Sequence, residues 1–293
     1  TKDIGLGSRA ALSSTGGAID STTKANEALS DGALTLNGVA VGASLAGSDK
    51  LSSGDNKAAS AIAKAAAINA VAEKSGVYAT VGKTTVAGSV AADAAAAVTA
   101  GDDGDVTING VTTATFYMSG NKEVDRATVV SAINDMADRT GVRAINTHDD
   151  NQGISLTAAD GRNIVLDVGT TNASVATLAQ MGMAAAGTYV GSYQLSTKDG
   201  SAITVGSTVA TSQTSEIRSG IRFGTYEAGM AQAATTTRAS TAAAPASGNA
   251  GVLNGNTLVI NGVGIQAAQG ADDDASFENI GSTKAASAIA IAA

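Results

Sequence analysis

The feature that most constrains this chain is a unit that recurs along it. Residues 57–63 read KAASAIA and return letter for letter as residues 284–290. Downstream of the first copy, an Ile-Asn pair ends at Asn69 and a Gly-Val pair follows at residues 76–77. The same two pairs recur, with the same spacing, from Asn134 to Val142. A unit used repeatedly indicates a chain of similar modules, which must be identified before any site is sought.

Each copy is preceded by an Asn-Gly pair between aliphatic residues. Both central positions of a type I′ turn need positive φ, which Asn and Gly tolerate, so this pattern predicts a tight β-hairpin. The three predicted turns are Leu36-Asn37-Gly38-Val39, Ile108-Asn109-Gly110-Val111 and Ile260-Asn261-Gly262-Val263.

A helix and a strand are predicted to follow each hairpin. Residues 58–74 are rich in alanine and place apolar side chains near one face, after a polar stretch at 52–56 that could cap the helix. Gly76 can end this helix in the left-handed conformation, and residues 77–81 read as a strand. In the second copy Val129, Ile133 and Met136 form the apolar stripe of a helix that Gly141 closes, and the third copy is expected to be truncated at the end of the sequence.

The intervening segments carry weaker signals. Two further hairpins are expected, one pairing residues 154–157 with 163–166 through Asp160-Gly161, the other pairing 189–195 with 202–205. Short helices are expected over residues 22–29 and 172–183, and an exposed linker over 235–247. The predicted divisions are a lead-in (1–30), a first module (31–100), a second module (101–170), a β-rich module with the linker (171–245) and a truncated third module (246–293).

The recurring residues resemble the IN motif of the variable central region of bacterial flagellins and some hook-associated proteins. Ile108-Asn109-Gly110-Val111, Ile133-Asn134 and the Gly-Val pair after it match that motif, and residues 158–164 are similar to the hairpin that often follows it. The first copy departs from the motif with Leu36 in place of Ile. The resemblance implies an α+β fold of repeated β-hairpin–helix–strand modules, forming elongated, β-rich outer domains.

It also implies a structural function: the surface-exposed variable region of a flagellar filament protein, corresponding to its D2 and D3 domains, extracellular and not an enzyme. Partners would be other flagellin subunits, through terminal helices that this sequence does not contain. Two alternatives remain open. One is a cell-surface flagellin homologue that acts as a polysaccharide-binding receptor or adhesin, and the other is a hook-associated or cap protein.

The composition limits the kinds of binding site and partner that we expect for this chain. The chain has no cysteine, which excludes disulfides and thiolate metal sites, and it has one histidine. A net charge of −8 argues against a nucleic-acid footprint, which would be basic. No uninterrupted apolar run approaches the length that spans a membrane, so membrane insertion is not expected.

One cluster could bind a ligand. Arg218, Arg222 and Arg238 occur near Tyr226 and Phe223, and such residues could hold an acidic sugar by charge-assisted hydrogen bonds and stacking. The alternative that we favour is a mixed surface on which these arginines pair with acidic residues, namely Glu216 and Glu227.

Other candidate sites are weaker. His148, beside Asp149 and Asp150, could belong to a hydrolase triad or a zinc site, but an exposed turn is favoured. The acidic runs at 102–105 and 272–274 could attract adventitious calcium, yet neither matches a calcium-binding loop, so no cofactor is expected. Residues 81–85 and 5–10 imitate phosphate- and dinucleotide-binding loops without the required glycine spacing or strand context. We predict no catalytic or metal-binding residue.

Overall fold

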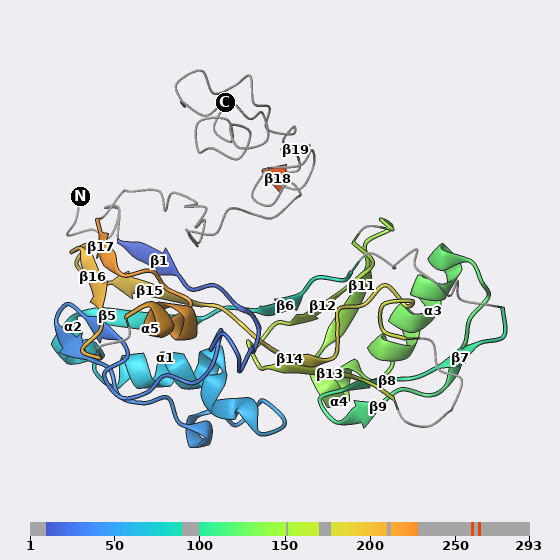
Figure 1. Cartoon of the computed structure of the whole chain (residues 1–293), viewed down its shortest axis with the longest axis horizontal. Helices are drawn as coiled ribbons and strands as arrows, with labels where there is room; N and C mark the ends of the chain where they lie inside the picture. The colour runs from blue at the N-terminus through green and yellow to red at the C-terminus, as the bar shows by residue number, and fades with distance from the viewer. Residues whose placement is uncertain are drawn as a thin grey trace, which may run out of the picture. The chain divides into compact units, whose positions relative to one another are not determined.

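The computed structural model describes residues 10–89, 100–150, 152–169, 177–209 and 212–227, together with the backbone of two short strands beyond them. The chain divides into two compact units, Thr1–Gln232 and Ala233–Ala293. In the described residues the fold is mixed α+β, with small antiparallel sheets and a few helices, as the sequence predicts (Figure 1).

The first group of elements in the unit Thr1–Gln232 contains two sheets, with strand orders β1–β15–β5 and β17–β16–β3–β4. Their strands are β1 (Ala11–Ser13), β15 (Tyr193–Thr197), β5 (Val77–Val81), β17 (Gly224–Tyr226), β16 (Ile203–Gly206), β3 (Thr35–Leu36) and β4 (Val39–Ala40). The helices are α1 (Ala61–Asn69), α2 (Ala72–Ser75) and α5 (Ser212–Ser219), with 3-10 turns at Ala46–Ser48 and Asn56–Ala59. Helix α1 packs along β5 (Figure 1).

The second group contains three sheets, with orders β11–β12–β6, β2–β14–β13–β8–β9 and β10–β7. Their strands are β11 (Arg143–Asn146), β12 (Ile154–Ala158), β6 (Thr84–Val86), β2 (Gly17–Ala18), β14 (Gly187–Val190), β13 (Ile164–Val168), β8 (Val106–Ile108), β9 (Val111–Thr112), β10 (Phe116–Tyr117) and β7 (Asp103–Gly104). Helices α3 (Lys122–Asn134) and α4 (Ala137–Thr140) belong to this group, and α3 packs against β11.

All three predicted Asn-Gly hairpins are confirmed. Strand β3 pairs with β4 and β8 with β9, each through one Asn-Gly turn. The φ angles at Asn37 and Gly38 are 49° and 81°, and those at Asn109 and Gly110 are 51° and 80°, as a type I′ turn requires. In the unit Ala233–Ala293 the described backbone is the third hairpin, formed by β18 (Val259–Ile260) and β19 (Val263–Gly264).

The turn asparagine of each described hairpin also makes long-range hydrogen bonds. Asn37 Oδ1 accepts the backbone N–H of Thr204 at 2.8 Å, and its Nδ2 donates to the Ser75 carbonyl at 2.8 Å. Asn109 makes the corresponding bonds to Val165 N (2.9 Å) and to the Thr140 carbonyl (2.9 Å). Each asparagine thereby ties its hairpin both to a neighbouring strand and to the end of a short helix.

The asparagine that ends each long helix holds the following strand in the same way. Asn69 exchanges two hydrogen bonds with the backbone of Ala79, at 2.8 and 2.9 Å. Asn134 exchanges two with the backbone of Ala144, at 2.9 and 3.0 Å. These bonds use both the carbonyl and the amide of the side chain, so a residue with only one of these functions could not replace asparagine fully.

The prediction of a single helix over residues 58–74 is wrong in two respects: the helix starts later, and it is interrupted. Helix α1 begins at Ala61 because Ser60 caps it, its Oγ accepting the N–H of Ala63 at 3.0 Å. The chain then leaves helical geometry at Val71 (φ −111°, ψ 7°) before α2. Met136 breaks the second helix in the same manner (φ −109°, ψ 13°). The predicted left-handed ends at Gly76 and Gly141 are confirmed, with φ of 73° and 71°.

The two further hairpins predicted from the sequence do not form. Strand β12 pairs with β11 and β6, whereas β13 pairs with β14 and β8. Strand β15 likewise pairs with β1 and β5, and β16 with β17 and β3. Strands β12 and β13 turn alternate side chains into one shared hydrophobic core, and β15 and β16 turn theirs into another. The two strands of each predicted hairpin therefore face each other across a core and lie in different sheets.

Two predicted short helices also fail in the described residues. Over residues 22–29 the chain forms turns and a single β-bridge between Asp20 and Ala25, because the Asp20 carboxylate accepts the N–H groups of Thr22 and Thr23 and competes with helical bonding. Residues 177–183 form turns, and the remainder of the predicted helix at 172–183 lies outside the described residues. The predicted linker at 235–247 lies outside them as well.

Strand pairing crosses the module divisions expected from the sequence. Strand β5 lies beside β15 with Val81 opposite Tyr193, so residues 82–192 are an insertion between two neighbouring strands. The insertion begins and ends at one place, since Gly82 N donates to the Ser192 carbonyl at 2.8 Å. Strands β15 and β16, expected in a separate module, therefore complete the sheets of β5 and β3.

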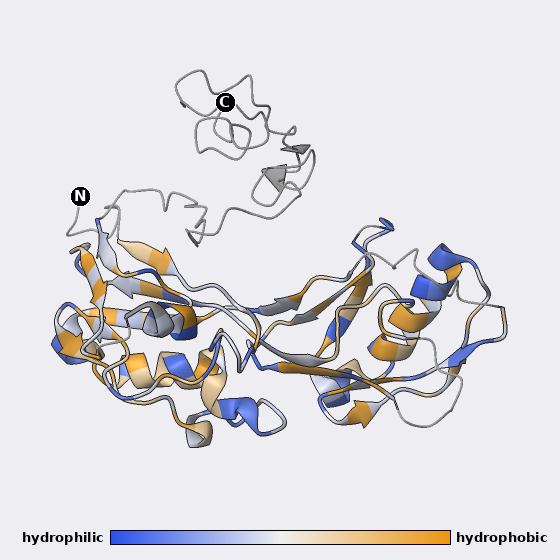
Figure 2. Ribbon diagram, in the orientation of Figure 1, coloured by the Kyte–Doolittle hydropathy of each residue, from blue (hydrophilic) through white to orange (hydrophobic). Residues whose placement is uncertain are grey.

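Two hydrophobic cores result. The first, here called the split core, takes its residues from both sides of the insertion and includes Leu12, Leu36, Ile68, Tyr193 and Leu195. The second, here called the insert core, comes entirely from within the insertion and includes Ile108, Ile133, Ile154, Leu156 and Leu166. Figure 2 shows hydrophobic residues along the helices and strands of both groups.

Hydrogen bonds link the loop before α1 to the insertion. Asn163 is fully buried; its backbone N–H donates to Ser52 Oγ at 2.7 Å and its Nδ2 donates to the Asn56 carbonyl at 3.0 Å. Asn56 Nδ2 in turn reaches Thr188 Oγ1 at 3.3 Å. A buried asparagine with backbone partners of this kind stabilises a contact between segments that are distant in sequence.

Candidate functional site

The basic–aromatic cluster predicted from the sequence lies around the C-terminal end of α5. Arg218 is in the last turn of α5 and forms an ion pair with Glu27, Nη2 to Oε2 at 3.3 Å. Arg222 is exposed, and its carbonyl accepts the hydroxyl of Tyr226 at 2.9 Å. Arg238 lies outside the described residues. The structure therefore keeps Arg222 and Tyr226 together and directs Arg218 to a carboxylate from another segment.

The acidic partners expected for this cluster are used differently. Glu216 Oε1 accepts the backbone N–H of Phe223 at 2.7 Å and so caps the turn that follows α5. Burial raises the pKa of the Tyr226 phenol, which keeps it a neutral donor. In its described part, the cluster offers a ligand the exposed guanidinium of Arg222 and the half-buried phenol of Tyr226.

His148 lies on an exposed turn, as favoured from the sequence, with a side chain that is 75% exposed. Its Nδ1 is 2.6 Å from Glu123 Oε1. The neighbouring Asp150 is paired with Arg126 and does not orient the imidazole. No serine or threonine hydroxyl is bonded to His148 in the described part of the chain, so the arrangement that activates a nucleophile is not assembled around it.

The group that organises this turn was not predicted from the sequence. The guanidinium of Arg126, only 6% exposed, donates to Glu123 Oε2 (2.7 Å), Asp150 Oδ1 (2.6 Å) and Asn146 Oδ1 (3.2 Å). Hydrogen bonding to Arg126 lowers the pKa of Glu123. The cluster fastens the loop after β11 to the first turns of α3. Glu123 and Arg126 are three residues apart, a spacing that on a helix could have indicated their ion pair.

A second missed group is Lys64 on α1. Its side chain is 3% exposed, and Nζ donates to the carbonyls of Arg218 (2.7 Å) and Asn26 (3.3 Å) with no carboxylate partner in the described residues. Desolvation by burial lowers its pKa to about 7. The lysine bonds a carbonyl in the last turn of α5, where a donor is favoured, and so joins α5 to α1. Its position beside Ala61, Ala65 and Ile68 on the helical repeat could have indicated its burial.

The remaining sequence candidates do not gather into sites. Asp105 is fully buried, Asp103 belongs to β7, and residues 272–274 lie outside the described part of the chain. Among the residues that the structure describes, no three His, Cys, Asp or Glu side chains are placed to hold a metal ion. Gly82 and Lys83 connect β5 to β6, so no helix N-terminus follows them to bind a phosphate.

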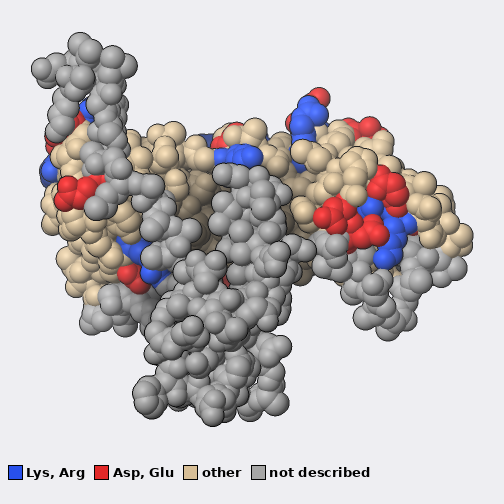
Figure 3. Space-filling model, turned by 90° about the horizontal axis from the view of Figure 1, so that it is seen from above, with Lys and Arg blue, Asp and Glu red and all other residues tan. Residues whose placement is uncertain are grey.

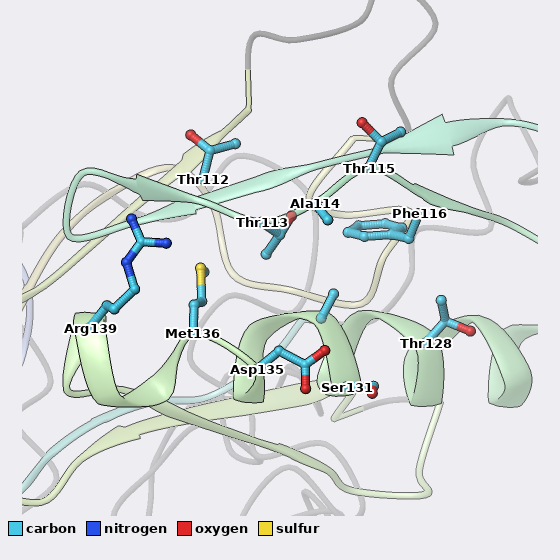
Figure 4. Close-up of a pocket in the computed structure, with 11 residues that line it drawn as sticks. Thr112, Thr113, Ala114, Thr115, Phe116, Thr128, Ser131, Asp135, Met136 and Arg139 are labelled. Carbon is cyan, nitrogen blue, oxygen red and sulfur yellow. The ribbon is translucent and has the colours of Figure 1, made fainter.

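The structure also contains an open groove that the sequence did not indicate. It has a volume of about 500 Å³ and lies between the segment 112–116, which runs from β9 to β10, and the outer face of α3 and α4. Figure 4 shows Met136 and Arg139 rising from the helical side toward the strand side, which carries Thr113 and Phe116, with Asp135 beside them on the helical side. The other lining residues are Thr112, Ala114, Thr115, Thr128, Ser131 and Ala132.

Hydroxyls, one carboxylate and one guanidinium make up the polar part of this groove. Asp135 is the C-cap residue of α3 and Arg139 lies in α4, four residues further on, and both are exposed. Met136 and Phe116 are 5% and 6% exposed and provide an apolar base between them. Asp135 and Arg139 are four residues apart, so they lie on the same side of the helical segment and line the same groove.

The molecular surface carries charges of both signs. On the face shown in Figure 3, acidic and basic side chains lie beside one another where the surface is described, among uncharged residues. In the described part of the chain no helix has both the length and the apolar character needed to cross a bilayer. No model of a known protein family matches the chain, and no curated protein sequence matches it either.

Proposed function

We propose that this chain is the outward-facing variable region of a flagellin-like filament protein, with a structural and not a catalytic role. The observation that carries the proposal is a shared hydrogen-bonding scheme in two segments of different sequence. In one, Asn37 bonds Thr204 N and the Ser75 carbonyl; in the other, Asn109 bonds Val165 N and the Thr140 carbonyl. These asparagines belong to the residues that resemble the flagellin IN motif.

The helix-ending asparagines support the same proposal. Asn69 and Asn134 each exchange two hydrogen bonds with the strand that follows, and each is seven residues before a glycine with positive φ. We infer that hairpin, broken helix and strand form one repeating module, that the module occurs twice in the unit Thr1–Gln232, and that the β18–β19 hairpin begins a third. Such modules, stacked outward from a filament, would form elongated β-rich domains.

The surface chemistry fits a filament exterior. A net charge of −8 keeps neighbouring copies from aggregating. Among the residues that the structure describes, few large hydrophobic side chains are exposed. The proposed partners are further flagellin subunits, engaged through terminal helices, and the proposed location is extracellular. In this proposal the His148 turn and the Arg126 cluster stabilise the fold and perform no chemistry.

Labelling of intact cells tests the proposal and separates it from the related alternatives. Antibodies raised against residues 100–169 should decorate flagellar filaments along their length, and the full-length gene should encode amphipathic helices on both sides of this region. Decoration only at the filament base or only at the tip would identify a hook-associated or a cap protein instead. Decoration of the cell body alone, in a gene without the flanking helices, would refute the filament proposal.

A further inference from the structure

The groove beside α3 and α4 contains two charged side chains that the fold does not use. Neither Asp135 nor Arg139 makes a side-chain hydrogen bond or ion pair within the described residues, although they are four residues apart and line one groove. Glu123, on the first turn of α3, is by contrast engaged with Arg126 and His148. An unpaired carboxylate and an unpaired guanidinium on one groove are available to a ligand.

The charges of these two side chains decide the net charge of the ligand. A carboxylate offers acceptors only, and a guanidinium offers donors only. Their charges cancel, so a phosphate or a polyanion would meet Asp135 repulsion beside Arg139 attraction. A purely apolar ligand would desolvate both groups without replacing their bonds to water, which is unfavourable. The groove therefore favours a ligand with no net charge that is rich in both donors and acceptors.

The hydroxyls that line the groove have hydrogen-bonding capacity left. Thr128 Oγ1 donates to the Val124 carbonyl at 3.0 Å and keeps its acceptor lone pairs. Thr113 Oγ1 accepts Val106 N at 3.1 Å and keeps its proton to donate. Thr112 Oγ1 is bonded to Thr107 Oγ1 at 2.8 Å, and this pair too has acceptor positions open. These groups are held by the fold and need little reordering to bind.

We propose that this groove binds an uncharged saccharide. Vicinal hydroxyls of a sugar can donate to both oxygens of Asp135 and accept from the fork of Arg139, while the C–H face of the ring rests on Met136 and the Phe116 edge. A volume of about 500 Å³ accommodates a short oligosaccharide in an open groove. The inference does not depend on the filament proposal, because it uses only the residues of the groove.

Binding of neutral oligosaccharides tests the inference on the complete chain. We would use uncharged oligomers of glucose, mannose and galactose as probes, followed by saturation-transfer NMR and calorimetry. Wild-type protein should bind at least one of them, and Asp135→Ala and Arg139→Ala should each weaken that binding by tenfold or more. Because both side chains are exposed and unpaired in the described structure, the melting temperature should not change.

Matched controls are available in the same helix and the strand after it. Asp138 and Arg143 are exposed and do not line the groove, so Asp138→Ala and Arg143→Ala should leave binding within twofold of wild type. The inference is overturned if no neutral oligomer binds at millimolar concentration, or if the Asp135 and Arg139 variants bind as well as the controls. It is also overturned if only polyuronates or peptides bind at the groove. Filament labelling is unaffected by any of these outcomes, so the two proposals fail separately.

Discussion

Lys64 is a residue whose burial changes its proton affinity strongly. Burial lowers its pKa from 10.5 to about 7, so the unfolded chain holds this proton over a range of pH in which the folded chain has lost it. Between about pH 7 and pH 10.5 the unfolded state therefore binds more protons, and the free energy of unfolding rises with pH through this window. Below pH 7 both states are protonated and the contribution is constant.

Lys64→Met should remove this pH dependence. We would measure the free energy of unfolding by urea denaturation at pH 7 and at pH 9.5. Between these two pH values it should rise on the order of 3 kcal/mol more for wild type than for the variant, at about 1.4 kcal/mol for each pKa unit. The variant loses the donor to the Arg218 carbonyl, so its absolute stability falls, but the pH slope is the measurement that tests the idea. Lys74→Met, at an exposed position on α2, is the control. Equal slopes in wild type and Lys64→Met would contradict the prediction.

At the scale of elements, the two helix–glycine–strand turns provide a matched comparison. Gly76 and Gly141 have nearly the same φ, 73° and 71°, but different surroundings. A methyl group at Gly76 would meet no atom within 4 Å, whereas one at Gly141 would overlap the guanidinium of Arg162. Arg162 donates to the Thr140 carbonyl at 3.2 Å, so displacing it also loses a bond to the end of α4.

We expect Gly76→Ala to lower the free energy of unfolding by about 1 kcal/mol, the cost of a side chain in left-handed geometry. Gly141→Ala should cost roughly 1 kcal/mol more, because a hydrogen bond to Arg162 is lost as well. Chemical denaturation measures both values. Adding Arg162→Ala should make the two alanine costs equal, and a remaining difference would show that Arg162 is not the cause.

At the scale of the whole unit, residues 82–192 form an insertion that we expect can be deleted without unfolding the rest. The split core and the insert core share no residue, and the insertion starts and ends where Val81 faces Tyr193. Replacing residues 82–192 with Asn-Gly should therefore leave a folded remainder, since a two-residue type I′ turn can join neighbouring antiparallel strands. The lost bonds of Asn163 to Ser52 and Asn56 lie outside the split core.

The shortened protein should melt cooperatively and keep a near-ultraviolet dichroism signal from Tyr193, whose hydroxyl is bonded to the Ser219 carbonyl at 2.7 Å. A variant with the same turn placed between residues 86 and 154 breaks the insert core and serves as the control. Loss of the cooperative transition in the first variant would mean that the split core depends on the insertion.

Much of the local structure could be predicted, and the candidate groove could not. The Asn-Gly turns, the glycine helix ends and strand β5 follow from residues within a few positions of one another. The groove depends on where residues 112–116 pass beside α3 and α4, and the break between these helices at Met136 was not predicted either. An apolar residue at position 136 fits a continuous helical stripe equally well, so periodicity carries no signal for the break.

The sequence by itself determined the Asn-Gly turns, the glycine helix ends and the recurring asparagines, because positive φ and the dual donor–acceptor character of Asn act over short distances. Only the tertiary structure decided which strands pair. Strands β12 and β13 alternate buried and less buried residues as a hairpin would, yet they face each other across a core. The alternation of buried and exposed residues shows which face of a strand is buried, but it does not show which other strand forms hydrogen bonds with it. That choice, and with it the insertion between β5 and β15, depends on packing between segments far apart in the chain.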